Sequence, residues 1–280
     1  MFQCTTFQKM GQLIVAASLV SAFFLPTGAK AATSEWVTSP GGMIRLVATA
    51  PEADGTIPAA LEVKLNPGWK TYWREPGASG IPPQVTLDPA GGVVLEKIGF
   101  PVPKTFDDGV VRYVGYDHSV AFPLTLKRTQ AAGDINIRAS VFLGICEDIC
   151  IPVQGELTLA LKQDVFDNPL DGARINDAIA ALPEAPSADF AVTASRYDAD
   201  RAMLHVTMRL PAGSGEPELF LAGPTGFAFG KPDIVVKDDP DVSASVPVRL
   251  TGKERELKGK PIVVTIRARD RSMETTLAFD

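Results

Sequence analysis

Short β-type runs, several of which alternate apolar and polar residues, recur along most of the chain and are separated by turn-forming residues. Seven of them lie between residues 36 and 162, at Met43–Thr49, Ala60–Leu65, Val93–Ile98, Val110–Tyr116, Val120–Leu126, Ile135–Phe142 and Glu156–Leu161. Alternation with a period of two is typical of strands that bury one face. The 24 Gly and 23 Pro among 280 residues favour many turns and disfavour a helical bundle. This part of the chain is therefore predicted to form an immunoglobulin-like β-sandwich.

The pattern changes between residues 167 and 187. Ile175, Ile179 and Leu182 stand at helical spacing, and Pro183 and Pro186 follow them. We interpret this segment as a short helix and a Pro-rich linker, which together mark a domain boundary. Strand-like runs resume after residue 188, at Ala202–Leu210, Glu218–Ala222, Ile234–Lys237, Ser245–Leu250, Pro261–Ala268 and Glu274–Phe279. The predicted fold is all-β, with immunoglobulin-like sandwich domains at residues 32–166 and 188–280.

The first 31 residues have the composition of a secretory signal peptide. Lys9 precedes an apolar run, Leu13–Leu25, and the small-residue motif Ala29–Ala31 follows it. The apolar run is shorter than the roughly 20 residues that a membrane-spanning helix needs. We therefore expect cleavage after Ala31, loss of Cys4 with the signal, no membrane span in the mature chain and a periplasmic location, where cysteine pairs oxidise.

The remaining composition excludes several function classes. The formal net charge is −6 and no run of five Lys or Arg occurs, so nucleic acid is not an expected partner. The two histidines, His118 and His205, are far apart and no local motif suggests a metal site or a catalytic triad around either. Neither a cofactor nor a bound metal is predicted.

The predicted mature chain keeps two cysteines, Cys146 and Cys150. In a continuous strand their Cα atoms would be about 13 Å apart, beyond the roughly 7 Å limit for a disulfide. If residues 147–149 form the three-residue loop of a hairpin, the two cysteines lie opposite each other at about 4.5 to 5.5 Å. That geometry permits a disulfide.

Three interpretations of this pair remain open on the residues alone. A structural disulfide over so short a loop would add only about 2 kcal/mol on the chain-entropy model, whereas bridges at a hairpin end are often labile or catalytic. Metal capture is the third, although no His or Met is within the motif. Glu147 and Asp148 between the sulfurs are expected to be solvated turn residues that raise the thiol pKa.

Three stretches of the sequence resemble one known family. They are Asn66–Pro83, with Trp69, Tyr72 and Trp73; Phe100–Phe106 with Tyr113–Tyr116 and Phe122–Pro123; and Gly144–Pro152. In this order they resemble the amino-terminal periplasmic domain of the DsbD-type thiol:disulfide interchange proteins, especially the ScsB branch linked to suppression of copper sensitivity. The resemblance covers about the first 150 residues, while the second domain is similar only in its β character.

The resemblance implies a role and a set of site residues. Cys146 and Cys150 would be the redox pair, which takes electrons from a membrane-embedded thiol carrier and passes them to thioredoxin-like or other oxidised periplasmic proteins. Trp69, Tyr72 and Trp73 match the segment that packs beside the redox hairpin. Phe106, in the segment Phe106–Gly109, matches the loop that covers the disulfide in the family, which we call the cap loop.

Two departures from the family pattern argue against a complete electron relay within this chain. The best-known members have five residues between their cysteines, whereas this chain has three, as in the copper-linked branch. The sequence also ends at Asp280 without membrane helices or a thioredoxin-like Cys-x-x-Cys domain. We therefore expect a separate protein to supply the electrons. The alternative is a non-catalytic periplasmic binding or scaffold protein with a structural hairpin disulfide and a link to copper stress.

Overall fold

The computed structural model describes Met1 and residues 33–77, 80–107, 109, 112–131, 133–162, 168–236, 241–250, 257 and 259–279. The predicted signal peptide beyond Met1, and Asp108 of the predicted cap loop, lie outside the described residues. Within the described part of the chain, no helix combines the length and the apolar character needed to cross a membrane.

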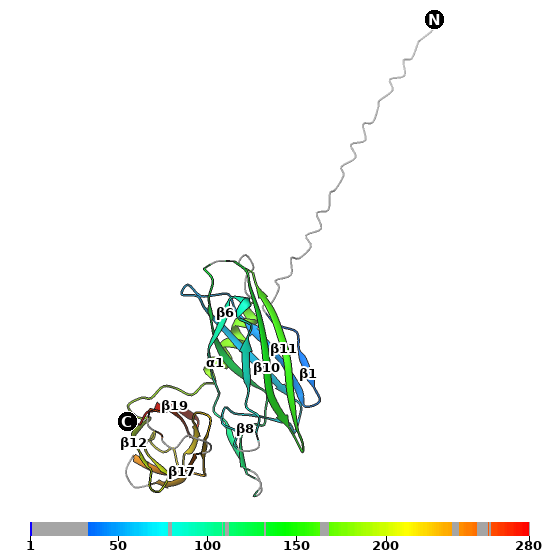
Figure 1. Cartoon of the computed structure of the whole chain (residues 1–280). Helices are drawn as coiled ribbons and strands as arrows, with labels where there is room; N and C mark the ends of the chain where they lie inside the picture. The colour runs from blue at the N-terminus through cyan, green and yellow to red at the C-terminus, as the bar shows by residue number, and fades with distance from the viewer. Residues whose placement is uncertain are drawn as a thin grey trace.

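Two antiparallel sheets form the first domain (Figure 1). One has the order β1-β2-β3-β9-β6, with strands Val37–Ser39, Gly42–Ala48, Thr56–Leu65, Val120–Arg128 and Val93–Ile98. The other has the order β11-β10-β4-β8-β7, with strands Cys150–Leu161, Ile135–Cys146, Lys70–Tyr72, Arg112–Tyr116 and Lys104–Asp107; β5 (Gln84–Leu87) also pairs with β10. A short 3-10 helix, η1 (Pro89–Gly91), precedes β6.

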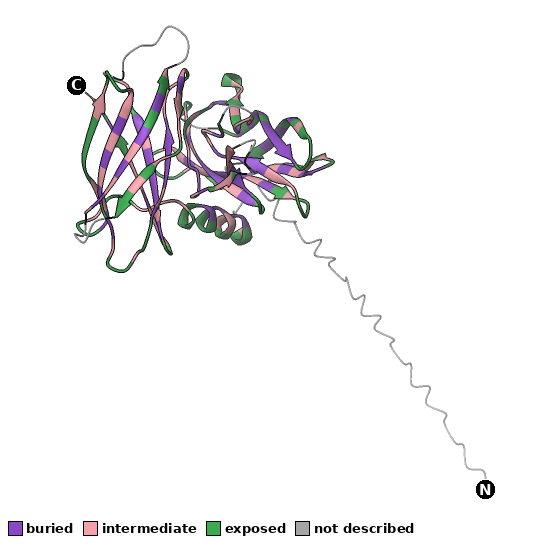
Figure 2. Cartoon of the chain, turned by 90° about the horizontal axis from the view of Figure 1, so that it is seen from below, coloured by how far each residue is buried: buried purple, intermediate pink, exposed green. Residues whose placement is uncertain are grey.

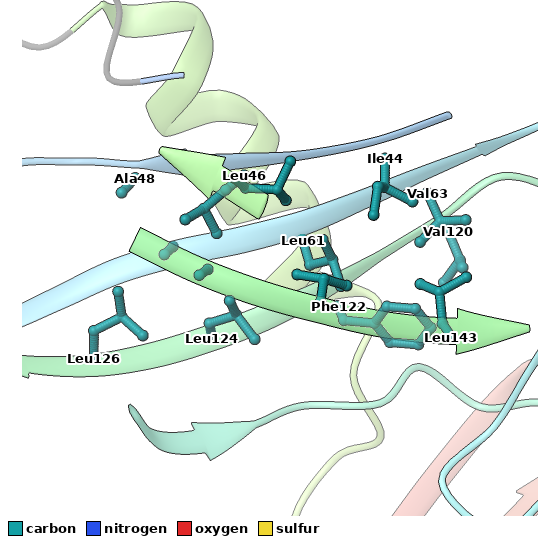
Figure 3. Close-up of a cluster of buried hydrophobic side chains, with 14 of the residues drawn as sticks. Ile44, Leu46, Ala48, Leu61, Val63, Val120, Phe122, Leu124, Leu126 and Leu143 are labelled. Atoms are coloured by element: carbon teal, nitrogen blue, oxygen red, sulfur yellow. The ribbon is translucent and has the colours of Figure 1, made fainter. Parts of the chain in front are cut away.

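The core of the first domain follows from the alternation of its strands. Ile137, Ala139 and Val141 of β10 are fully buried, while the residues between them face outward. They pack with side chains of the facing sheet such as Leu61 and Phe122, part of the cluster drawn in Figure 3. The last four residues of β10 are all buried, which shows that this end of the strand is covered on both faces.

The predicted helix is present as α1 (Pro169–Ala180), and it begins at an Asn168 cap whose side chain accepts a hydrogen bond from Leu170 N. Its buried face differs from the predicted one. Ile175 and Ala178 pack on β2, β3 and β9, whereas Ile179 is 48% exposed and α1 ends two residues before Leu182. Figure 2 shows α1 mostly in the colour of exposed residues, so only a narrow face of the helix is covered, and Ile179 lies outside that face.

The second domain also consists of two antiparallel sheets. One has the order β12-β13-β17-β15, with strands Ala191–Asp198, Met203–Arg209, Asp241–Leu250 and Phe227–Phe229, and β16 (Asp233–Val236) also pairs with β17. The other has the order β14-β18-β19, with strands Glu218–Ala222, Ile262–Ala268 and Arg271–Leu277. The predicted all-β fold with two immunoglobulin-like sandwiches and a short connecting helix is confirmed.

Strand β14 of the sheet β14-β18-β19 has two buried faces. Leu219 and Leu221 of β14 point into the core of the second domain, whereas Phe220 and Ala222 pack with the core of the first. This explains why β14 is a continuous apolar run instead of an alternating one. The two domains therefore share an apolar contact at β14.

Candidate functional site

The two cysteines close the longest hairpin of the molecule. β10 and β11 are paired along twelve residues each, and the last pair is Cys146 with Cys150. Residues 147–149 form the loop, and the Cα atoms of the cysteines are 4.1 Å apart and joined through a disulfide. The hairpin and the pairing predicted from the spacing are thus present, with the Cα atoms slightly closer than expected.

The two cysteines differ in exposure. Cys146 is only 7% exposed, because β10 has β11 on one side and β4 on the other, where Lys70 is its partner. Cys150 begins β11, the edge strand of the sheet, and is exposed. An incoming thiol from another molecule therefore has access to Cys150 in preference to Cys146.

Tyr72 is the side chain that contacts both sulfurs. Its hydroxyl oxygen lies 2.9 Å from Sγ of Cys150 and 3.0 Å from Sγ of Cys146. Because disulfide sulfurs carry no hydrogen, the hydroxyl must be the donor. Burial, and to a smaller extent the nearby Tyr113, raises the pKa of Tyr72 above its usual value of 10.0. The phenol therefore stays protonated, and able to donate, at neutral pH.

Gly144 makes room for the Tyr72 ring. The two residues lie on neighbouring strands, and a Cβ atom at Gly144 would stand 2.9 Å from Cε2 of Tyr72 and 3.0 Å from Cβ of Ile81. Behind the ring, Thr71 Oγ1 donates a hydrogen bond of 2.9 Å to the carbonyl of Gly144, which holds β4 against β10. The tyrosine reaches the disulfide because the neighbouring strand has no side chain at this point.

A row of aromatic rings continues from Tyr72 towards the edge of the sheet. Tyr113 meets Tyr72 edge-on with ring centroids 5.7 Å apart, and Phe106 stacks on Tyr113 at 4.9 Å. Nζ of Lys70 lies 5.8 Å from the Phe106 ring centroid. Phe106 is partly buried in β7, and Gly109, which follows that strand, has a φ of 83°. Phe106 thus joins the site through Tyr113.

The two tryptophans of the predicted segment lie differently. Trp69 is partly buried and its ring fills the space above Gly41 beside Ile145, the residue before Cys146. Trp73 is fully buried in the core of the first domain, and its ring meets Phe220 of the second domain at 6.1 Å. The structure therefore brings Tyr72 to the sulfurs and turns Trp73 towards the second domain. Trp69 is linked to the sulfurs through Ile145, and Phe106 through Tyr113 and Tyr72.

Other polar residues of interest lie away from the sulfurs or in solvent. Glu147 and Asp148 are exposed in the hairpin loop, as expected for turn residues. His118 is exposed beside Asp117, and Nδ1 of His205 lies 3.0 Å from Oγ of Ser245 in the second domain. Within the described residues, no group of three or more His, Cys, Asp and Glu side chains could hold a metal ion.

Sequence reasoning missed three members of the site: Lys70, Tyr113 and Gly144. Each of them belongs to a strand-like run or to a stretch that carries the family resemblance. A single sequence, however, does not give the register between strands that are far apart in the chain. The one available signal is Gly144 itself, because a glycine inside an apolar strand often marks the close approach of another group.

Comparisons with known proteins agree with this geometry. Residues 45–162 match the family described as thiol:disulfide interchange protein DsbD, N-terminal, and residues 181–280 match a domain of unknown function, DUF8393. The crystal structure of the N-terminal periplasmic domain of ScsB from Proteus mirabilis is 25% identical, with a TM-score of 0.69 over 89% of this chain and 100% of that one. No match is found among curated proteins. The resemblance seen in the sequence is confirmed.

Proposed function

We propose that this chain, whose first domain is of the DsbD N-terminal type, relays electrons between proteins through the Cys146–Cys150 pair. The family match and the hairpin disulfide support thiol-disulfide exchange in general. The direction we propose is reduction of the pair by a membrane-embedded thiol carrier, followed by reduction of thioredoxin-like or other oxidised periplasmic proteins. The relative with a solved structure is a periplasmic domain, which supports the same compartment for this chain.

The first half of the cycle begins at Cys150, the exposed sulfur. A thiolate of the donor attacks Cys150 Sγ, the Cys146–Cys150 bond breaks, and a mixed disulfide forms between the donor and Cys150. Cys146 leaves as a thiolate, to which the Tyr72 hydroxyl donates a hydrogen bond. A second donor thiol then attacks the mixed disulfide, so the donor becomes a disulfide and the pair, with two electrons and two protons, becomes two thiols.

The second half of the cycle reverses these steps with another protein. The Cys150 thiolate attacks a disulfide of the acceptor and forms a mixed disulfide with it. Cys146, next to Cys150 in the hairpin, then attacks Cys150 Sγ, which restores the Cys146–Cys150 bond. The acceptor leaves with two thiols, and the two electrons and two protons taken up in the first half have passed to it.

The observation that carries this proposal is the Tyr72 hydroxyl, 2.9 and 3.0 Å from the two sulfurs. A hydrogen bond to an ionised acceptor is about twice as strong as one between neutral groups. Tyr72 therefore stabilises a departing Cys146 thiolate more than it stabilises the disulfide. A purely structural bridge needs no such donor, and the three-residue loop that it closes adds little to stability.

Single-cysteine variants of the full chain test the proposal. In Cys146→Ala, the exposed Cys150 thiol is expected to form mixed disulfides with a donor or acceptor, which non-reducing electrophoresis and mass spectrometry of periplasmic extract would identify. Cys150→Ala is the matched control, because its remaining thiol is buried and should trap far less. Capture of a thioredoxin-like or membrane thiol protein by Cys146→Ala supports the relay. Absence of any trapped partner in both variants would favour a binding or scaffold protein.

A further inference from the structure

Three consecutive residues, the last of β4 and the two that follow it, connect the disulfide to the second domain. Tyr72 contacts the sulfurs, Trp73 is buried against Phe220, and Arg74 pairs with Glu274 of β19. Tyr72 reaches the sulfurs, whereas Trp73 and Arg74 both reach the second domain, so one short segment contacts both the hairpin and the other domain.

The ion pair across the domain boundary is held by contacts from both domains. Nη2 of Arg74 lies 3.0 and 3.2 Å from the two carboxylate oxygens of Glu274. Thr265, a fully buried residue of β18, donates a hydrogen bond of 2.8 Å to the same carboxylate. On the first-domain side, the guanidinium lies 4.6 Å from the ring centroid of Phe100. Both side chains are at least three-quarters buried, so solvent screens this pair less than a surface pair.

The apolar contact beside this pair acts on the same segment. Trp73 belongs to the first-domain core, and Phe220 of β14 packs in that cluster together with Ala222. The second domain thus supplies part of the apolar surface against which Trp73 rests. Neither Phe220 nor Glu274 contacts the disulfide directly.

We propose that the second domain holds Tyr72 in position to donate to the disulfide, with Glu274 as a positioning residue that acts through Arg74. This inference rests on the proposed function and assigns a role to the region that matches a domain of unknown function. A hydrogen bond weakens steeply as its angle and length change, so a small shift of β4 alters the support that Tyr72 gives to a departing thiolate. Gly144 and Tyr113 also confine the ring, so the effect of the second domain is partial.

The test measures how fast glutathione reduces the disulfide in the purified full chain. Glu274→Gln keeps the size of the side chain and removes its charge, and we expect the rate to fall about two- to fivefold, a part of what loss of a charge-assisted hydrogen bond costs. Arg74→Gln breaks the same pair from the first-domain side and should slow the reaction similarly. Thermal melting of each variant verifies that it is folded.

Arg271→Gln is the matched control. Arg271 also lies in β19, and its guanidinium donates two hydrogen bonds, of 2.8 and 2.9 Å, to the carboxylate of Glu184 in the linker. It has no contact with β4 among the interactions described. Its loss should leave the rate of reduction by glutathione unchanged.

A double-mutant cycle separates positioning from general loosening. If Glu274 acts through Tyr72, then Glu274→Gln should have no further effect in a Tyr72→Phe background. Wild-type rates in Glu274→Gln and Arg74→Gln, or an equal slowing by Glu274→Gln with and without the Tyr72 hydroxyl, would overturn the inference alone. A wild-type disulfide that glutathione does not reduce at all would overturn the proposed function and this inference with it.

Discussion

Among the places where a sheet is covered on both faces, one at the disulfide and one at the domain contact have different roles. In the first domain, the end of β10 is buried from both sides because Tyr72 lies over Gly144. In the second, β14 is buried from both sides because Phe220 packs on the other domain. Alternation alone builds the two sandwiches. The departures from alternation in β10 and β14 mark the disulfide site and the domain contact, whereas those in β2 and β3 lie under α1.

The hairpin at the disulfide site and the hairpin beside the domain contact also differ. The β10–β11 hairpin ends in two cysteines around a three-residue loop, whereas the β18–β19 hairpin ends in Ala268 and Arg271 around a two-residue turn. Both hairpins stabilise a sandwich. Only the first presents a bond that another protein can break, so the relay chemistry that we propose belongs to the first domain and the support of Tyr72 to the second.

The largest expected effect comes from removing both sulfurs. The variant Cys146→Ala with Cys150→Ala should lose thiol-disulfide exchange completely, because no other cysteine of the predicted mature chain remains. Its unfolding free energy should fall by only about 2 kcal/mol, since the loop is short. Glutathione exchange and chemical denaturation measure the two quantities. Unfolding of the first domain in this variant would instead assign the disulfide a structural role.

Loss of the Tyr72 hydroxyl should have the next largest effect. Tyr72→Phe keeps the ring over Gly144 but removes the donor, and we expect reduction of the disulfide by glutathione to slow about tenfold, as for loss of a hydrogen bond worth about 1.4 kcal/mol to a charged group. Tyr197→Phe in the second domain, a partly buried tyrosine of β12, is the control and should leave the rate unchanged. Equal rates in Tyr72→Phe and the wild type would remove the proposed role of the hydroxyl.

A smaller effect, of opposite sign, is expected at Phe106. If this ring shields the disulfide as the family resemblance implies, Phe106→Ala should accelerate its reaction with small thiols severalfold and leave the melting temperature nearly unchanged. Stopped-flow kinetics and thermal melting together check this prediction. A normal rate with a large loss of stability would show that Phe106 serves the packing of the β7–β8 hairpin only.

The smallest effect concerns pH. Because burial raises the pKa of Tyr72 above 10.0, its hydroxyl remains a donor at every lower pH. The ratio of the wild-type rate to the Tyr72→Phe rate should therefore stay constant between about pH 6 and pH 9, while both rates rise as glutathione ionises. A ratio that falls across this range would mean that Tyr72 ionises much earlier than its burial implies.

The difference between the two regions also explains what the sequence could predict. Strand-like runs predicted most of the longer strands but not β4 and β7 of the site, and the spacing of Cys146 and Cys150 predicted the hairpin end, because both are local patterns. The contact of Tyr72 with the sulfurs depends on the register between β4 and β10, which are more than 60 residues apart in the chain. The exposure of Ile179 likewise depends on how α1 lies on the sheet. Strand register and helix packing of this kind cannot be deduced from the local patterns of a single sequence.

The central claim is that Cys146 and Cys150 form an exchangeable pair, and its most direct test is the reduction potential. The full chain would be equilibrated in glutathione buffers of graded ratio, its thiols trapped, and the reduced fraction counted by mass. We predict a midpoint well above about −300 mV, the value below which structural disulfides lie. A pair that stays oxidised until the buffer is more reducing than that value would contradict the relay and identify the bond as structural.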